Sequence, residues 1–196
     1  GDVYKRQVEQ YFGKHAELVL DPTLLLDADD YVIERKTSCS ETAEQDTLVS
    51  YVLDTDGQKA KIANDVAGEL GLKESFMGLS PKKSDGSPDK MITIQSWLDN
   101  LRNASFVVTD SFHGCVFSII NRKPFIAIVN HSRGADRFVS MLSQLGLEGR
   151  MVNDYEEYSV RRSELMAPID YSNVYARLQT LKAHSLGYLS GMLERK

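Results

Sequence analysis

Residues 106–129 read FVVTDSFHGCVFSIINRKPFIAIV, and this stretch decides the fold of the chain. Residues 106–109 form a short β-branched, apolar run, which predicts a strand, and residues 110–114 then interrupt it with turn-forming side chains. Residues 115–120 predict a buried helix, and residues 125–129 predict a second buried strand. Strands that are apolar on both faces are typical of a parallel sheet covered by helices on both sides.

Strands and helices alternate on both sides of this stretch. Upstream, we expect short strands at residues 16–20, 48–53 and 76–79. Downstream, residues 151–152 predict an edge strand, and residues 171–193 predict a long terminal helix that folds back across a neighbouring layer. Other predicted helices carry apolar residues at helical spacing, namely Ile62, Val66 and Leu70 before a Gly71 cap, then Ile94, Trp97, Leu98, Leu101 and Ala104 after a Thr93 cap, and Phe138, Met141, Leu142 and Leu145 before Gly146.

The alternation predicts an α/β fold with a Rossmann-like, doubly wound and mostly parallel sheet. We expect a single domain in which residues 27–46, which are polar and lack a clear period, form an insertion with one helical turn at most. Residues 80–90 predict a loop without core residues. The carboxyl ends of the strands are the place where such sheets bind ligands.

Composition excludes several classes of protein. The 196 residues are 42% hydrophobic, and 23 basic against 28 acidic side chains give a net charge of −5. This balance argues against a nucleic-acid surface and a polybasic membrane patch. No stretch approaches the ~20 apolar residues of a membrane span, nothing resembles a signal peptide, and we interpret Cys39 and Cys115 as reduced thiols. We therefore expect a cytoplasmic protein without an integral membrane segment.

The first residues carry a different signal. Asp2-Val3-Tyr4-Lys5-Arg6-Gln7 looks like the translation of a transposon end used to fragment DNA for sequencing. We expect residues 1–7 to be a non-native adapter scar, with the natural sequence starting near Val8 and truncated upstream.

His113 is the first candidate for chemistry. It lies where a predicted strand meets a predicted helix N-terminus, whose free N–H groups and dipole favour an anion, and Gly114 allows close approach of the backbone. An imidazole there can bind a carboxylate or phosphate, or transfer a proton near neutral pH. The alternative is that Asp110 or Ser111 simply caps the helix while His113 packs in the turn. The residues alone leave both open.

A second polar cluster, residues 130–137, follows the next strand and should emerge at the same edge of the sheet. Arg133 and Arg137 are suited to a planar carboxylate or a phosphate because their guanidinium groups donate in a fork. Asn130 is the third candidate contact. The alternative is helix capping by Asp136 with solvated arginines.

Signals for other chemistries are absent from the sequence. His15 and His184 have no cysteine or acidic partners at metal-ligand spacing, which predicts no metal site. The dinucleotide-binding, phosphate-loop and serine-hydrolase motifs are missing as well. We therefore expect no cofactor.

Several short runs, taken together and in order, resemble the polysaccharide pyruvyl transferase family. The resemblance covers nearly all of residues 8–193 and implies a two-domain architecture similar to GT-B glycosyltransferases. Residues 8–196 would then be the second, Rossmann-like domain, and the N-terminal domain would be missing. The runs are LDPTLLL at 20–26, WL at 97–98, RNA at 102–104, FVVTDSFHG at 106–114, KPF at 123–125, RG at 133–134 and RF at 137–138.

The resemblance implies transfer of the enolpyruvyl unit of phosphoenolpyruvate to a sugar, giving a pyruvate ketal across two hydroxyls. The acceptor would be a saccharide, lipid-linked in one version, in the biosynthesis of a bacterial cell-surface or exopolysaccharide. His113 would contact phosphoenolpyruvate or act as a general acid, and residues 111–114, including Ser111 and Gly114, would hold its anionic groups. Roles for Arg133 and Arg137 follow from their position. The fragment alone is expected to be inactive, because the missing domain supplies acceptor contacts.

One residue departs from the family pattern. Some members have an arginine two places before the histidine for phosphoenolpyruvate, whereas this chain has Ser111. The identity of the donor is therefore open, with Arg133 as the substitute cation. Two alternatives remain: a GT-B-type glycosyltransferase that uses a nucleotide-sugar donor, and a non-catalytic sugar-binding relative.

Overall fold

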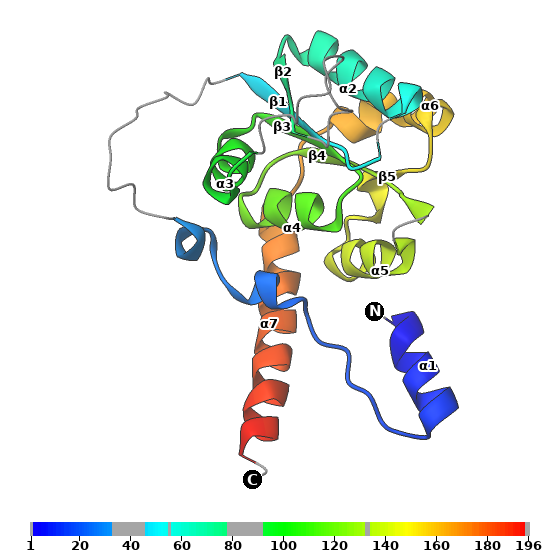
Figure 1. Ribbon diagram of the computed structural model, residues 1–196, viewed down its shortest axis with the longest axis vertical. Coiled ribbons are helices and arrows are strands. Elements are labelled where there is room, and N and C mark those ends of the chain that lie inside the picture. Colours follow the sequence, from blue (N-terminus) through cyan, green and yellow to red (C-terminus); the bar gives the residue numbers. More distant parts are fainter. Residues whose placement is uncertain (1, 33–45, 55, 78–91, 132–133, 195–196) are drawn as a thin grey trace, which may run out of the picture.

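Five parallel strands form one sheet at the centre of the molecule (Figure 1). The structure is a computed structural model that describes residues 2–32, 46–54, 56–77, 92–131 and 134–194. The strand order β2-β1-β3-β4-β5, with every pair parallel, confirms the predicted α/β, Rossmann-like fold. The strands are β1 (Thr47–Tyr51), β2 (Lys73–Phe76), β3 (Phe106–Thr109), β4 (Phe125–Ile128) and β5 (Met151–Val152).

Helices cover both faces of this sheet (Figure 1). On one face lie α2 (Gly57–Leu70) and α6 (Tyr155–Met166). On the other lie α3 (Ile94–Asn103), α4 (Phe112–Ile120) and α5 (Ala135–Leu145), backed by the first half of α7 (Tyr171–Leu193). The remaining helix, α1 (Asp2–Phe12), lies away from the sheet, and 3-10 turns occur at Pro22–Leu25, Ala28–Tyr31 and Glu148–Arg150.

The central strands are buried on both sides, as their sequence predicts. Phe106 and Val108 of β3 pack with α2 and α6, whereas Val107 between them packs with the opposite helix layer. Alternate residues of β4 divide in the same way. Because burial of one such side chain contributes about 1.5–3 kcal/mol, β3 and β4 anchor the sheet.

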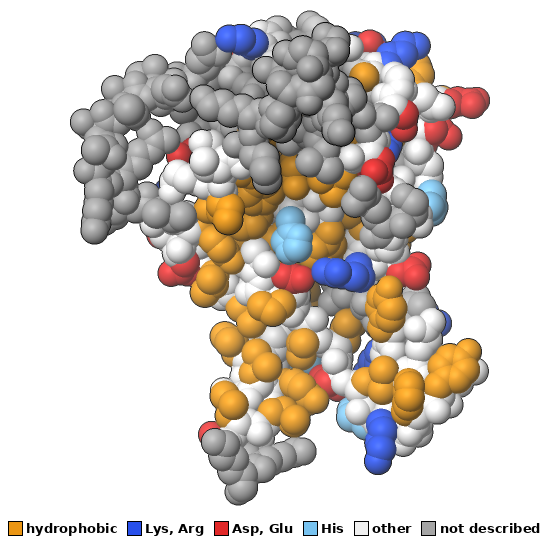
Figure 2. Space-filling model, viewed as in Figure 1, with side chains coloured by type: hydrophobic (Ala, Val, Ile, Leu, Met, Phe, Trp, Pro, Cys, Tyr) orange, Lys and Arg blue, Asp and Glu red, His pale blue; other side chains and the backbone are white. Residues whose placement is uncertain are grey.

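Most predicted helix ends are confirmed. The Thr93 side chain accepts a hydrogen bond from the Ser96 N–H at 3.1 Å, so it caps α3. Gly71 and Gly146 end α2 and α5 with left-handed backbones, at φ 65° and 71°. The bounds of α7 agree with the prediction; its buried residues run from Val174 to Ser185, whereas Leu186, Leu189 and Leu193 in its last turns are exposed. The end of α7 projects from the sheet and its helices (Figure 1), and hydrophobic side chains lie on its surface (Figure 2).

Some local predictions are wrong. Residues 16–20 form no strand or helix, and the Leu20 N–H donates to Ser185 Oγ on α7 at 3.0 Å. Strand β2 begins at Lys73, three residues before the predicted start at Phe76. The sequence pattern did not indicate this start because β2 is an edge strand whose residues are mostly exposed and carry little apolar signal. Ile94 and Leu70 are exposed although they lie at apolar positions of their helices.

Some predictions concern residues outside the described part of the chain. These are most of the insertion at 27–46, the loop at 80–90, Cys39 and Arg133. In the described part, Cys115 is a buried, free thiol, and none of the helices is long and apolar enough to cross a membrane.

Candidate functional site

The strand order places a crevice at the carboxyl edge of the sheet, the edge where the parallel strands end. Chain order reverses between β1 and β3, because β2 lies on one side of β1 and β3 on the other. Tyr51 pairs with Thr109, and Thr109 pairs with Ala127, so β1, β3 and β4 end side by side. A reversal of this kind is where open α/β sheets bind ligands.

A cavity of about 220 Å³ opens at this edge, and we name it the edge cavity. Its lining comes from the ends of β1, β3 and β4 and from the first turns of α4 and α5. The lining residues are Leu53, Asp110, Ser111, Phe112, His113, Asn130, Gly134, Ala135 and Phe138. Five of the six predicted site residues are described, and the edge cavity brings together three of them, His113, Ser111 and Asn130.

His113 lies in the first turn of α4 and not in a separate loop, because the helix already begins at Phe112. Its side chain is exposed, and its ring meets the Phe112 ring edge-on at 5.3 Å between centroids. An imidazole in this position is accessible to a ligand in the edge cavity. Both functional options from the sequence, anion contact and proton transfer, are chemically open to it.

Ser111 is the N-cap of α4, as one of the alternatives predicted. Its Oγ accepts from the Gly114 N–H at 3.4 Å, and its own N–H donates to Thr109 Oγ1 at 3.0 Å. Ser111 is 5% exposed, so it orders the turn. The backbone N–H groups of Phe112 and His113 lie in the first turn of the helix, where no helix carbonyl precedes them to accept their hydrogen bonds. Such N–H groups are suited to an anion.

Gly114 has a packing role that the sequence did not indicate. A Cβ at this position would lie 2.2 Å from Thr109 Oγ1 and 2.9 Å from Thr109 Cβ. The glycine therefore allows α4 to approach β3 closely. It lies outside the lining of the edge cavity, one residue after His113 in the first turn of α4.

A second helix N-terminus faces the same cavity. Gly134 is the N-cap of α5 with φ 81°, a left-handed conformation that suits glycine, and no side chain caps the helix there. Gly134 and Ala135 both line the edge cavity. Two helix N-termini, each carrying about half a positive charge, therefore converge on one small space.

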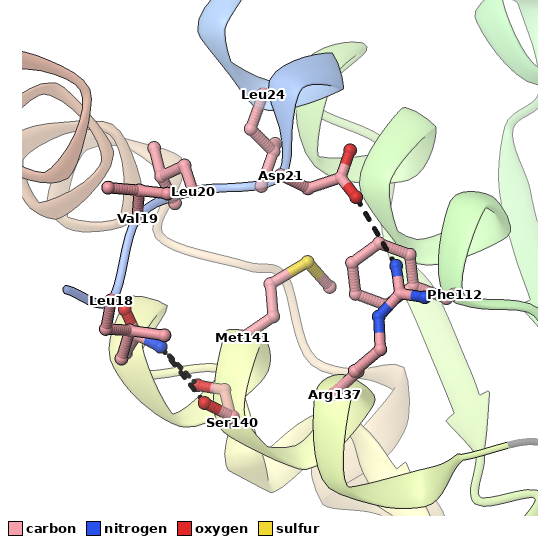
Figure 3. A pocket seen from close by; sticks show the side chains of 10 residues that line it. Leu18, Val19, Leu20, Asp21, Leu24, Phe112, Arg137, Ser140 and Met141 are labelled. Carbon is pink, nitrogen blue, oxygen red and sulfur yellow. Dashed lines mark hydrogen bonds and ion pairs between the residues drawn. The ribbon is translucent and has the colours of Figure 1, made fainter. Parts of the chain in front are cut away.

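Arg137 lies on the other side of Phe112, in a separate cavity of about 190 Å³ (Figure 3). Its guanidinium group is 4.5 Å from the centre of the Phe112 ring and 3.4 Å from a carboxylate oxygen of Asp21. Figure 3 shows the arginine held between these two groups and beside Met141. The structure thus places Arg137 next to the His113 turn but outside the lining of the edge cavity.

Asp110 is a buried carboxylate that ties the three strand ends together. Its Oδ1 accepts from the Leu53 N–H at 2.7 Å, and its Oδ2 accepts from Lys59 Nζ at 3.0 Å, the Asp54 N–H at 3.2 Å and Asn130 Nδ2 at 3.2 Å. We name this set the strand-end clamp. From the sequence we treated Asp110 only as a possible helix cap and did not identify Lys59. The position of Asp110 directly after a buried strand was the signal that could have identified it as a residue of the ligand-binding edge.

Within the part of the chain that the structure describes, the other groups of interest are a buried thiol and a cavity at the opposite edge of the sheet. Burial raises the pKa of the Cys115 thiol, and the nearby charge of Asp110 raises it further, so this thiol is not a nucleophile. In the described residues, no group of three His, Cys, Asp or Glu side chains could hold a metal ion. A mostly apolar cavity of about 430 Å³ lies at the opposite edge of the sheet, beside Phe106 and Pro124.

Comparison with known proteins identifies the family. A model described as polysaccharide pyruvyl transferase matches residues 2–132, which include the edge-cavity residues from Leu53 to Asn130 and stop before Arg133 and Arg137. A comparison with curated proteins found no match. The family is one of transferases, so the match indicates polysaccharide pyruvyl transferase activity in general. Because it covers more than half of the chain, the chain belongs to the polysaccharide pyruvyl transferase family.

Proposed function

We propose that the edge cavity binds phosphoenolpyruvate and that the complete protein transfers its pyruvyl unit to a saccharide, forming a ketal. The observation that carries this proposal is the convergence of two helix N-termini and an exposed imidazole on one cavity at the carboxyl edge. Phosphoenolpyruvate is a small, multiply charged anion with a phosphate and a carboxylate. Free backbone N–H groups and helix dipoles favour such groups.

The proposed reaction balances without a cofactor. One hydroxyl of the acceptor adds to the central carbon of phosphoenolpyruvate while its methylene carbon takes a proton and becomes a methyl group. The bond from the central carbon to the phosphate oxygen then breaks, and a second hydroxyl of the same saccharide forms the other bond of the ketal. Of the two hydroxyl protons, one balances the new methyl proton and the other leaves with the inorganic phosphate.

His113 is the residue that we assign to proton transfer or phosphate contact in this reaction. It is exposed and lines the cavity, and imidazole can donate a proton near neutral pH. Ser111 orders the turn, and the N–H groups of Phe112 and His113 provide donors in place of the missing arginine. Arg133 remains our candidate for an additional cationic contact, and Arg137 for a contact beside the cavity.

The acceptor is proposed to be a cell-surface or exopolysaccharide precursor, free or lipid-linked, handled in the cytoplasm. An N-terminal domain of the GT-B type is proposed to supply its contacts, so transfer needs a longer protein than this chain. Donor binding needs only the edge cavity, which this chain contains.

Isothermal titration of the 196-residue chain with phosphoenolpyruvate and with nucleotide sugars tests the donor. Binding of phosphoenolpyruvate, but not of nucleotide sugars, is the expected result. Binding of a nucleotide sugar alone would favour the glycosyltransferase alternative. Binding of saccharides with neither donor would favour a non-catalytic relative.

A further inference from the structure

We propose that Lys59 sets the affinity of the edge cavity for an anion by neutralising Asp110, although Lys59 is not one of the lining residues. The proposal rests on the proposed function for the identity of the anion, phosphoenolpyruvate. Lys59 would thus be a positioning residue that acts through the charge of Asp110.

The wall of the edge cavity carries a buried negative charge. Asp110 lines the cavity, and its side chain has no exposed surface. A carboxylate there repels an incoming anion, and the repulsion is strong because little water lies around it to screen the charge. An anion site beside this residue therefore requires a compensating positive charge.

Lys59 supplies that charge from helix α2. Its ammonium group is 3.0 Å from Asp110 Oδ2, and its side chain is only 13% exposed. It also donates to the Asp54 carbonyl at 2.7 Å and lies 3.6 Å from a carboxylate oxygen of Asp56, whose side chain is 52% exposed, so Asp110 is its nearer and more deeply buried carboxylate partner. The other described groups that hydrogen-bond Asp110 are two backbone N–H groups and the Asn130 amide, which carry no full charge.

Among the described residues that line the cavity, His113 is the only one with a basic side chain. None of its nine residues is a lysine or an arginine. Removal of the Lys59 charge would therefore leave Asp110 opposing the two helix N-termini. The positive potential that favours an anion would fall.

A purely structural role makes a different prediction. In that case the clamp only holds the β1 end and Asn130 in place, and loss of either charged partner would damage binding equally. A double variant separates the two roles, because it removes both charges while it leaves polar groups of similar size.

The experiment measures phosphoenolpyruvate and inorganic phosphate binding by titration calorimetry at low salt. The variants are Lys59→Gln, Asp110→Asn and the double variant, and thermal melting reports which of them are folded. Lys61→Gln is the matched control, since it removes the same charge from an exposed position on the same helix. Lys59→Gln should weaken binding by roughly 10- to 100-fold, and Lys61→Gln by no more than about twofold.

The decisive comparison is between the single and double variants. Asp110→Asn should bind anions at least as tightly as the wild type, and the double variant should recover to within about twofold of it. The proposal is overturned if Asp110→Asn weakens binding as much as Lys59→Gln, or if the double variant is the weakest. If the wild type binds phosphate in this pattern but not phosphoenolpyruvate, the proposed donor is wrong while the role of Lys59 stands.

Discussion

Replacement of Gly114 by alanine should destabilise the protein, because the added methyl group has no room. Its Cβ would lie 2.2 Å from Thr109 Oγ1, an atom that donates to the Tyr51 carbonyl at 2.6 Å. Overpacking costs about 1–3 kcal/mol, and a lost hydrogen bond costs about 1 kcal/mol. The helix propensity of alanine returns about 1 kcal/mol. The net expectation is a loss of roughly 1–3 kcal/mol, or about 2–12 °C in melting temperature for a chain of this size.

Urea unfolding followed by circular dichroism measures this effect, and Gly187→Ala is its control. Gly187 lies inside α7, and a Cβ there meets nothing within 4 Å, so the control should be neutral or stabilise by up to about 1 kcal/mol. Thr109→Ala removes the nearest atom, Oγ1, and leaves Thr109 Cβ at 2.9 Å, so Gly114→Ala should cost at least about 1 kcal/mol less in that background. Equal stability of Gly114→Ala and wild type, or an unchanged cost in the Thr109→Ala background, would refute the proposed packing role.

Three further predictions follow from single residues. His113→Ala should leave thermal stability nearly unchanged, because the side chain is exposed. The same variant should lower the rate of phosphate release in the complete enzyme by at least about 100-fold. Retained activity would remove His113 from the mechanism. Burial raises the pKa of Tyr171 in the folded protein. The contribution of its neutral hydroxyl to stability is therefore complete below the pKa of an unfolded tyrosine, about 10, and declines at higher pH. Tyr171→Phe should lose less stability than the wild type in alkaline melts, and an identical decline would contradict this reasoning. In a Cys39→Ser variant, the buried Cys115 should react with a thiol reagent only after unfolding, and rapid labelling of the folded protein would show that the thiol is accessible.

The sequence predicts the central fold well where the apolar pattern is strong. Strands β3 and β4 are apolar on both faces, and α7 has a capping aspartate and a long apolar stripe, so these elements lie close to where we expected them. The pattern fails at residues 16–20, which are apolar because they pack near α5 and α7 and not because they pair with a strand. It also fails for β2, whose neighbours in the sheet determine its position.

The candidate site was only partly visible in the sequence. The turn around His113 could be recognised because a strand signal, a capping serine and a helix signal follow one another. The strand-end clamp could not, because Asp110 meets Lys59 and Asn130 only after β1, β3 and β4 align. The position of Arg137 on the far side of Phe112 likewise depends on how α5 packs against residues 18–24.

The most direct test of the central claim is amide chemical-shift mapping of the ¹⁵N-labelled chain during titration with phosphoenolpyruvate. The two helix N-termini predict saturable shifts at Phe112 and His113 on α4 and at Gly134 and Ala135 on α5. An absence of shifts, or shifts confined to the apolar cavity beside Phe106 and Pro124 at the opposite edge, would contradict it.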